Sequence, residues 1–277
     1  MSSSERDLEV ALAAAALAAD LIRNDYEDFV PIPDAPVEIS TATDRGAQEI
    51  ILQYLRQQFP GDSLCAEEAT ETLAGAAHAG HRLWVVDPID GTRGFATKCG
   101  EFSVMIGLLI DGELAVGVVD EPIPKRVTYA RRGAGCWVSE AGGSPRRCHV
   151  STVPTLREAT LIQSHSKRPG IYSNEVKALK PAKVVEVFSA GVKLALVARG
   201  EGELYLNTYS KFHDWDICAG HLLVTEAGGM VTRLLGDPIT YGSTNFTQDG
   251  GLLATNGAIH AEAAAILTRL ASSSGAA

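Results

Sequence analysis

The chain has 277 residues, of which 45% are hydrophobic, so it is long enough for one large domain or two smaller ones with a substantial core. Its 34 acidic and 24 basic residues give a formal net charge of -10, which argues against a nucleic-acid scaffold because such proteins present a basic face. The excess of acids suits a protein that gathers carboxylates around cations, although acids scattered over a solvated surface would give the same sum.

The five cysteines are odd in number and contain no C-x-x-C pair, which argues against a disulfide framework or a structural zinc site and fits a reducing compartment. The Ala-rich stretch 10–19 lacks a positively charged leader, and no stretch is long enough to span a bilayer. We therefore expect a soluble, cytoplasmic protein without a membrane partner.

Two helices are predicted at the start of the chain. Residues 5–24, rich in Ala and Leu, form the first, and residues 30–37, with three prolines, form a loop. Thr43 can cap a second helix that runs to about Gln58. Asp44 falls in its first turn, where the helix dipole alone favours an acid by about 0.3–1 kcal/mol.

The most informative stretch is 82–95, Arg-Leu-Trp-Val-Val-Asp-Pro-Ile-Asp-Gly-Thr-Arg-Gly-Phe. Its apolar run 83–86 is typical of a strand. We expect this strand to end at Asp87 and Pro88, because proline cannot continue a central strand ladder.

Two carboxylates, Asp87 and Asp90, lie three positions apart at this strand end, where packing explains them poorly. Gly91 permits close backbone approach, and Thr92 adds a hydroxyl beside the acids. Mg²⁺ takes oxygen ligands from a few carboxylates and from substrate phosphates, so this turn favours a magnesium site. The alternative is a turn in which two aspartates cap backbone N–H groups.

Asp111 and Gly112, between two apolar runs, predict a two-residue hairpin. The strands expected around and after it are 102–110, 113–119, 127–130, 135–138 and 147–151. The first half thus reads as two helices laid against an antiparallel meander.

After about residue 152, strands alternate with helices, which indicates a second α/β layer. The predicted strands are 160–164, 184–188, 204–206 and 251–256, and the predicted helices are 190–198, 216–227 and 259–270. We expect an N-terminal α+β domain, residues 1–151, that carries the metal motif. A C-terminal α/β domain, residues 152–277, would complete the metal and substrate site.

Five acids lie at predicted helix starts, in a loop or at a strand end, namely Asp44, Glu67, Asp87, Asp90 and Asp216. Two carboxylates about 4 Å apart repel by about 4 kcal/mol at an effective dielectric of about 20, so several together would require cations. Divalent metals would neutralise them, polarise a phosphoryl oxygen and acidify a water molecule. The amides of Gly91 and Thr92 could then hold phosphate oxygens. No covalent nucleophile is evident, which favours direct attack by activated water, but spacing alone does not establish that the acids converge.

Three segments carry a resemblance to a known family: Trp84-Val-Val-Asp-Pro-Ile-Asp-Gly-Thr-Arg-Gly-Phe95, Asp214-Trp-Asp-Ile-Cys-Ala-Gly220 and Glu226-Ala-Gly-Gly229. Together they resemble the inositol monophosphatase superfamily of Mg²⁺-dependent, lithium-sensitive phosphatases, and the resemblance covers essentially the whole chain in order. It implies a layered α-β-α-β-α sugar-phosphatase fold. It also implies hydrolysis of a phosphomonoester with two to three Mg²⁺ ions, and inhibition by Li⁺.

The resemblance implies a set of metal ligands, the side chains of Glu67, Asp87, Asp90 and Asp216 and the carbonyl of Ile89. Asp44 would serve an additional, weaker metal or its water. Thr92, oriented with Glu67 or Asp44, would help to activate the attacking water. The amides of Gly91 and Thr92 would hold the phosphate beside Asp90 and Asp216.

Further details resemble the 3′(2′),5′-bisphosphate nucleotidase branch of that superfamily. The segment Gln163-Ser-His-Ser-Lys-Arg-Pro169 is similar to its segment near the nucleotide, which implicates Ser164 and His165. Lys193 falls where that branch has a nucleotide-binding lysine. The branch's Gly-Ser-Ser before this lysine is here Ser-Ala-Gly, which weakens the nucleotide assignment. A surface histidine and a solvated helix lysine are the alternative interpretations.

The favoured substrate at this stage is adenosine 3′,5′-bisphosphate, which would lose its 3′-phosphate to give AMP. The alternatives are an inositol-phosphate or other small sugar-phosphate phosphatase and a non-catalytic regulator that binds a nucleotide or a protein. Positive side chains near a second phosphate, such as Lys193 or Arg168, would favour the nucleotide. A short neutral pocket would favour inositol phosphate. We expect a small phosphate ester as partner, no nucleic-acid polymer, and a monomer or homodimer.

Overall fold

The computed structural model describes residues 3–36, 38–166, 170–209, 211–243 and 245–274. Its helices are α1 (Ser3–Asp28), α2 (Ala42–Gln58), α3 (Glu71–Ala74), α4 (Thr92–Ala96), α5 (Asn174–Leu179), α6 (Ala190–Ala198), α7 (Asp214–Glu226) and α8 (His260–Ser274). Its strands are β1 (Ser63–Ala66), β2 (Arg82–Asp90), β3 (Ser103–Ile110), β4 (Glu113–Glu121), β5 (Arg126–Arg131), β6 (Gly135–Glu140), β7 (Arg146–Arg147), β8 (Thr160–Gln163), β9 (Lys183–Glu186), β10 (Leu204–Asn207), β11 (Lys211–His213), β12 (Met230–Thr232), β13 (Thr247–Asp249) and β14 (Leu252–Thr255).

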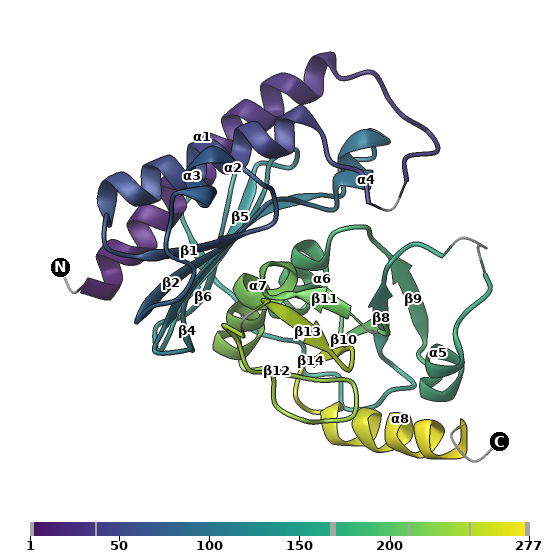
Figure 1. The fold of residues 1–277 in the computed structure, drawn as a ribbon. Helices are drawn as coiled ribbons and strands as arrows, with labels where there is room; N and C mark the ends of the chain where they lie inside the picture. The colour runs from purple at the N-terminus through teal and green to yellow at the C-terminus, as the bar shows by residue number, and fades with distance from the viewer. Residues whose placement is uncertain (1–2, 37, 167–169, 210, 244, 275–277) are drawn as a thin grey trace.

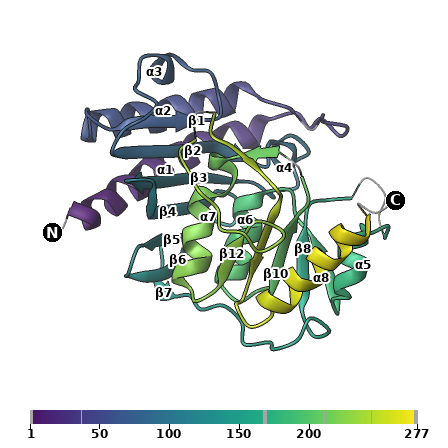
Figure 2. The ribbon, with the colours of Figure 1, turned by 60° about the horizontal axis from the view of Figure 1, so that its bottom comes forward.

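These elements stack in five layers, α-β-α-β-α (Figure 1). Helices α1 and α2 cover the outer face of the first sheet, whose strand order is β1-β2-β3-β4-β5-β6-β7. Helices α6 and α7 lie between this sheet and the second one, whose order is β12-β14-β10-β8-β9. Figure 2 shows α8 crossing the far side of the second sheet, close to α5. The layered α/β fold expected from the resemblance is confirmed.

The first sheet is the predicted antiparallel meander with one addition. Asp111 and Gly112 have φ of 54° and 79°, and two positive φ values in succession match the two-residue hairpin turn that their sequence predicts. The addition is β1, which pairs in parallel with β2, where no strand was predicted. This pairing brings the end of β1, and Glu67 after it, beside the end of β2.

Two predicted helix starts were wrong by two residues, for the same reason. Helix α2 is capped by Thr41 rather than Thr43, because the Asp44 carboxylate accepts the Thr41 N–H at 2.9 Å in a capping box. Helix α7 begins at Asp214 rather than at Asp216, and the Asp216 carboxylate accepts the N–H of the capping residue at 2.5 Å. In both helices the acid that the sequence singled out occupies the third helical position.

The expectation that Pro88 ends its strand was also wrong. Strand β2 continues to Asp90, but its register against β3 shifts, since Asp87 faces Met105 whereas Asp90 faces Ser103. One extra residue on β2 makes a bulge, which is where a proline can be accommodated within a sheet. The bulge sends both carboxylates to the cavity end of the strand.

The middle layer holds the two halves of the chain together. Side chains of α6 and α7 share one hydrophobic cluster with residues from both sheets. Close approach is possible because Gly117 of β4 faces α7, where an added Cβ would lie 2.5 Å from the Ala219 carbonyl oxygen. The division at residue 151 separates the two sheets, but as a domain boundary it stays a prediction. Among the described residues, no helix is long and apolar enough to cross a membrane.

Gly117→Ala is expected to lower the free energy of unfolding by about 1–3 kcal/mol, because the methyl group overpacks the contact between β4 and α7. Gly61→Ala is the matched control, since its Cβ would meet nothing within 4 Å, and it should change stability by less than about 0.5 kcal/mol. Urea unfolding followed by circular dichroism measures both variants. Equal stability of the two would show that α7 does not pack this closely on the sheet.

Candidate active site

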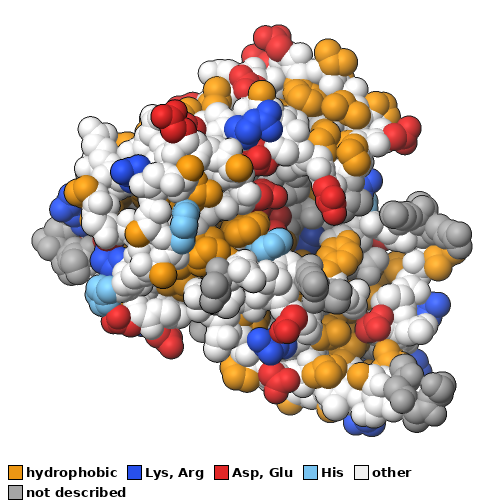
Figure 3. Space-filling model, viewed as in Figure 1, with side chains coloured by type: hydrophobic (Ala, Val, Ile, Leu, Met, Phe, Trp, Pro, Cys, Tyr) orange, Lys and Arg blue, Asp and Glu red, His pale blue; other side chains and the backbone are white. Residues whose placement is uncertain are grey.

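A cavity of about 360 Å³ opens at the end of β2. Figure 3 shows the hollow between the upper and lower parts of the molecule, with charged side chains and histidine at its edges. Of the residues predicted for the site, those on the cavity wall are Glu67, Asp87, Ile89, Asp90, Gly91, Thr92, Ser164, His165 and Asp216. Asp44 and Lys193 stand behind this wall. The convergence that spacing could not establish is therefore present.

Of these acids, Asp87 has the negative charge that the surrounding protein stabilises least. It is 2% exposed, and its Oδ1 atom has no hydrogen-bond partner. Burial raises the pKa of Asp87 well above its ordinary value, and the nearby Glu67 and Asp90 raise it further. An orphaned, buried carboxylate oxygen that faces other carboxylates needs either a proton or a cation.

Glu67 reaches the same point from the loop after β1. Its N–H donates to the Val86 carbonyl at 3.3 Å, which extends the β1–β2 pairing by one residue, and its carboxyl group lies next to that of Asp87. The residue as a whole is exposed, but its carboxyl group is desolvated where it enters the cavity. This burial, with a contribution from Asp216, raises the pKa of Glu67 to about 8.

Asp216 enters from the first turn of α7. One of its carboxylate oxygens accepts the His213 N–H, as a capping residue does, and the side chain is 29% exposed. Burial raises its pKa to about 7, against the lowering effect of that hydrogen bond, and Asp90 adds to the rise. His213 occupies the N-cap position of α7, and its ring stacks on Trp215.

Asp90 differs from the other acids because donors from α6 surround it. It accepts the N–H of Gly191 at 2.6 Å, the N–H of Ala190 at 3.1 Å and the hydroxyl of Ser189. Ser103 also donates to it, at 3.4 Å. Burial raises the pKa of Asp90, and these donors lower it in part. Sequence analysis missed Ser189, although a serine before an apolar helix is the usual N-cap signal.

Asp44 and Thr92 form a hydrogen-bonded pair next to the cavity. The Thr92 hydroxyl lies 2.9 Å from Asp44 Oδ1 and 3.0 Å from the Ile89 carbonyl oxygen, so its hydrogen is shared between these two acceptors. Asp44 is fully buried and also accepts hydrogen bonds from Thr41. With its hydrogen directed inward, the Thr92 oxygen is left as an acceptor on the cavity side.

Gly91 is required where the chain turns from β2 into α4. Its φ of 86° lies in the left-handed region, and an added Cβ would lie 2.9 Å from the Glu101 carbonyl oxygen and 3.0 Å from the Ser189 nitrogen. The amides that follow, beginning with Thr92, open a helical turn, where N–H groups lack partners within the helix. These amides are therefore placed at the edge of the acidic cavity.

The acids fit a divalent cation in their chemistry. No group of three or more His, Cys, Asp and Glu side chains in the described ranges is arranged as a ready-made metal site. Mg²⁺ does not require such a cage, because it commonly takes one or two carboxylates, water and substrate phosphate oxygens. The unpartnered Asp87 Oδ1 and the raised pKa values of Glu67 and Asp216 indicate carboxylates that a cation would stabilise.

The residues expected near the nucleotide do not all lie on the cavity wall. Ser164 and His165 line the main cavity and an adjoining one of about 180 Å³. Lys193 is 1% exposed, and its ammonium donates to the carbonyls of Val187 at 2.9 Å and Phe188 at 2.8 Å. Arg168 lies outside the described residues.

Several wall residues had no sequence signal. They are Glu38, Ile39 and Ser40 between the proline-rich loop and α2, Phe188 before α6, and Tyr209 after β10. Each sits in an irregular segment, where neither periodicity nor a motif marks a contact. Arg93 also lines the cavity, inside the motif but without a predicted role.

Comparison with known proteins agrees with the fold. The family model "Inositol monophosphatase family" matches residues 4–272. The chain is 33% identical to the histidinol-phosphatase of Mycobacterium tuberculosis over 96% of this chain and 98% of that protein. It is 29% identical to a probable 3′(2′),5′-bisphosphate nucleotidase of Arabidopsis thaliana over 84% of this chain and 69% of that protein.

The solved structure of an inositol monophosphatase from Anabaena (Nostoc) matches with a TM-score of 0.77 at 28% identity, covering 97% of both chains. The names of these three proteins give three different substrates. The similarity therefore supports membership of the family but does not identify one substrate. The chain belongs to the inositol monophosphatase family.

Proposed function

We propose that this protein is a Mg²⁺-dependent phosphomonoesterase that hydrolyses a small phosphate ester in the cavity at the end of β2. The observation that carries the proposal is the meeting of Glu67, Asp87, Asp90 and Asp216 around one cavity, with one buried Asp87 oxygen left without a partner. A pure binding protein would gain nothing from this repulsion, whereas cations that neutralise the acids would also attract a phosphate group.

The metal ligands in this proposal are the same four acids, together with the carbonyl of Ile89, and Asp44 serves an additional, weaker ion. Mg²⁺ bound there would polarise the phosphoryl group and lower the pKa of water. Inhibition by Li⁺ is part of the proposal, because a smaller charge at the same ligands stabilises the phosphate less.

The chain's own groups orient the reactants. Asp44 takes the hydrogen of the Thr92 hydroxyl, so Thr92 presents a lone pair that can accept a hydrogen bond from the attacking water. The amides at Gly91 and Thr92 would donate hydrogen bonds to the phosphate oxygens. The carboxylate of Glu67, a metal ligand in this proposal, can accept a hydrogen bond from the attacking water and so help to orient it.

Two observations favour different substrates. Ser164 and His165 line the cavity, as the sequence motifs predicted for adenosine 3′,5′-bisphosphate. Against this, the adjoining cavity of about 180 Å³ is lined by polar and apolar groups and contains no lysine or arginine among its described lining residues. We therefore place an ester with a single phosphate first, histidinol phosphate or inositol 1-phosphate by the names of the relatives, and keep the bisphosphate as second candidate.

Phosphate release should require Mg²⁺ and should fall at least about 100-fold in Asp87→Asn, since even residues that only support a metal ligand contribute about 10–100-fold. Asp87 is chosen because its Oδ1 has no hydrogen bond within the protein to lose. Glu113→Gln, an exposed acid at the other end of the sheet, is the control for loss of one charge. If the wild type with Mg²⁺ released negligible phosphate from every ester tried, this result would contradict the proposal that the protein is an enzyme.

Without divalent cations, the protein should become less stable as pH rises. The pKa of Asp216 is raised to about 7 and that of Glu67 to about 8, so their contribution to stability is complete below the ordinary carboxyl pKa and is lost as pH rises through these values. The melting temperature in EDTA should therefore decline between about pH 5 and pH 8.5. Mg²⁺ should raise it more at about pH 8.5 than at about pH 6, because binding at the lower pH must displace protons. A rise that is independent of pH would place the bound Mg²⁺ elsewhere.

A panel of histidinol phosphate, inositol 1-phosphate and adenosine 3′,5′-bisphosphate separates the candidates by kcat/KM. We expect the bisphosphate to be poorest by about tenfold or more, because a second phosphate without a cationic partner loses its solvation. Preference for the bisphosphate would instead support the nucleotidase branch.

A further inference from the structure

A cavity of about 310 Å³ lies against the C-terminal half of α7, away from the acid in the first turn of that helix. Volumes of about 300–1,000 Å³ are typical of sites that bind small organic molecules. The walls come from the hairpin between β3 and β4, from α7 and from the loop 239–241. Among the described residues, no lining residue is shared with the acidic cavity. This space, called the α7 cavity below, is therefore separate from the proposed active site.

Two polar side chains that line the α7 cavity are bound to each other. His221 Nδ1 lies 2.7 Å from the Tyr241 hydroxyl, and neither side chain has another hydrogen-bond partner in the described part of the chain. Burial lowers the pKa of His221 to about 4, so its ring is neutral at physiological pH. A neutral imidazole has one donor and one acceptor nitrogen, and a phenol can both donate and accept. Whichever group donates in their shared bond, the pair keeps one donor and one acceptor for a ligand.

Apolar groups form much of the remaining wall. Leu114, Leu222 and Ile239 contribute aliphatic side chains, and Tyr241 contributes its ring. Several of these side chains pack on the hydrophobic cluster between the two sheets, which holds the wall in place. An aromatic ring placed here would exchange contact with water for contact with these side chains, which is favourable. A planar molecule could thus bind the walls with its ring and the His–Tyr pair with one polar edge.

The charged side chains that line the α7 cavity are partnered or solvated. The two carboxylate oxygens of Glu226 each accept a backbone N–H from the β5–β6 turn, at 2.8 Å. Arg132 Nε donates to the Leu114 carbonyl oxygen, and the guanidinium lies 3.9 Å from Glu113. The Arg132 side chain is 49% exposed and that of Glu113 is 77% exposed, so water screens both charges. A charged ligand would lose solvation in the cavity without gaining a buried counter-charge from these described residues.

The loop that closes the α7 cavity is bound to the first turn of α7. The Gly242 N–H donates to Asp214 Oδ2 at 2.7 Å. Gln248 Nε2 donates to Asp214 Oδ1 at 2.6 Å and to the Thr240 carbonyl at 2.7 Å. Asp214 is fully buried and is the first residue of α7. A ligand held between Tyr241 and α7 would therefore also restrain the Gly242 amide.

We propose that the α7 cavity is a second ligand site, which binds an uncharged aromatic molecule whose edge carries both a hydrogen-bond donor and an acceptor, as in an aryl carboxamide. The His–Tyr pair binds the edge, the apolar walls bind the ring, and the bound molecule restrains the loop 239–242 against α7. The site does not depend on the proposed phosphatase function, because none of its lining residues belongs to the acidic cavity.

The first test locates the site with benzamide as the probe, titrated into the full-length protein and followed by NMR chemical shifts. A Kd near about 1 mM is expected for a ligand of about nine non-hydrogen atoms. Thr225→Phe, which places a larger side chain in the cavity wall, should weaken binding at least about tenfold. Thr268→Phe on α8 is the matched control, since both threonines are exposed and donate to the carbonyl four residues before them. No saturable binding, or equal binding by both variants, overturns the proposal.

The second test addresses the charge of the ligand. Benzamide, benzoate and benzamidine have nearly the same shape, and at neutral pH they are neutral, anionic and cationic. Only binding that Thr225→Phe weakens is counted, so that benzamidine bound at the acids of the other cavity does not contribute. Benzamide should bind at least about fivefold more tightly than the other two, because a charge loses its solvation in the α7 cavity. Equal or tighter binding of benzoate would assign the site to anions through Arg132, and that of benzamidine would assign it to cations; either result overturns the proposal.

The third test is Tyr241→Phe, which removes one hydroxyl and also serves if Thr225→Phe does not fold. It should weaken benzamide about fivefold, as loss of one hydrogen bond does, and should change the affinity for toluene, which has no polar edge, by less than about twofold. In the wild type, saturating benzamide should slow hydrogen exchange of the Gly242 amide at least about threefold. Equal effects of Tyr241→Phe on both probes, or unchanged exchange at Gly242, would contradict binding between Tyr241 and α7.

Discussion

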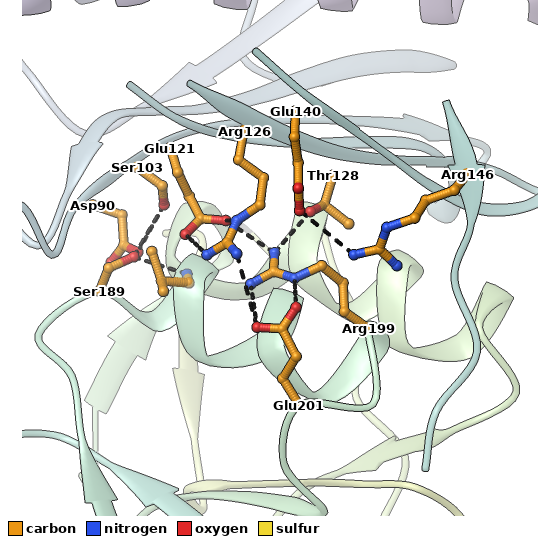
Figure 4. A network of polar contacts seen from close by, with 11 residues as sticks. Asp90, Ser103, Glu121, Arg126, Thr128, Glu140, Arg146, Ser189, Arg199 and Glu201 are labelled. Carbon is orange, nitrogen blue, oxygen red and sulfur yellow. Dashed lines mark hydrogen bonds and ion pairs between the residues drawn. The ribbon is translucent and has the colours of Figure 1, made fainter. Parts of the chain in front are cut away.

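The contact between Asp90 and the start of α6 is the constraint on which the rest of the structure depends. A carboxylate at the end of a strand in the first sheet accepts two backbone N–H groups and a hydroxyl from the helix of the middle layer. Arg199, at the other end of α6, donates to Glu121 and Thr128 of the same sheet (Figure 4). Because α6 is held at both ends, the second half of the chain meets the first at a fixed position, and the cavity forms along that junction.

This arrangement also explains why the acids can be brought together at all. Asp90 and Asp216 each accept hydrogen bonds at a helix start, where the N–H groups and the helix dipole favour negative charge. The buried charge of Lys193 lowers the pKa of both further, although burial still dominates. Asp87 and Glu67 have no such support, and their pKa values rise accordingly. The proposed cation would therefore have its largest effect at these two residues.

Local sequence patterns predicted the elements whose conformation depends on neighbouring residues. They failed for the elements whose conformation depends on contacts with distant parts of the chain. Asp111 and Gly112 fix a hairpin by their own conformational preferences, and helix 190–198 was predicted to the residue from its apolar run. Strand β1 depends on pairing with a strand some 20 positions later along the chain, and the bulge at Pro88 depends on the register against β3. The acids could be identified because packing explains their positions poorly. Only the layered topology, which the resemblance implied, brings them together.

The contacts of Lys193 show why a motif position does not determine which groups a side chain binds. A lysine on an apolar helix can point its ammonium to solvent, to a ligand or to backbone carbonyls, and the same sequence permits all three. What decides here is the geometry of the loops around Val187 and Ser164, whose oxygens come within hydrogen-bond distance before any ligand does. The acidic side of the cavity is built on β2, α4 and α7, which are regular elements. The side around Ser164 and Phe188 is built on loops, which tolerate sequence change better than regular elements, so this side can vary while the acids that we propose as metal ligands stay in place.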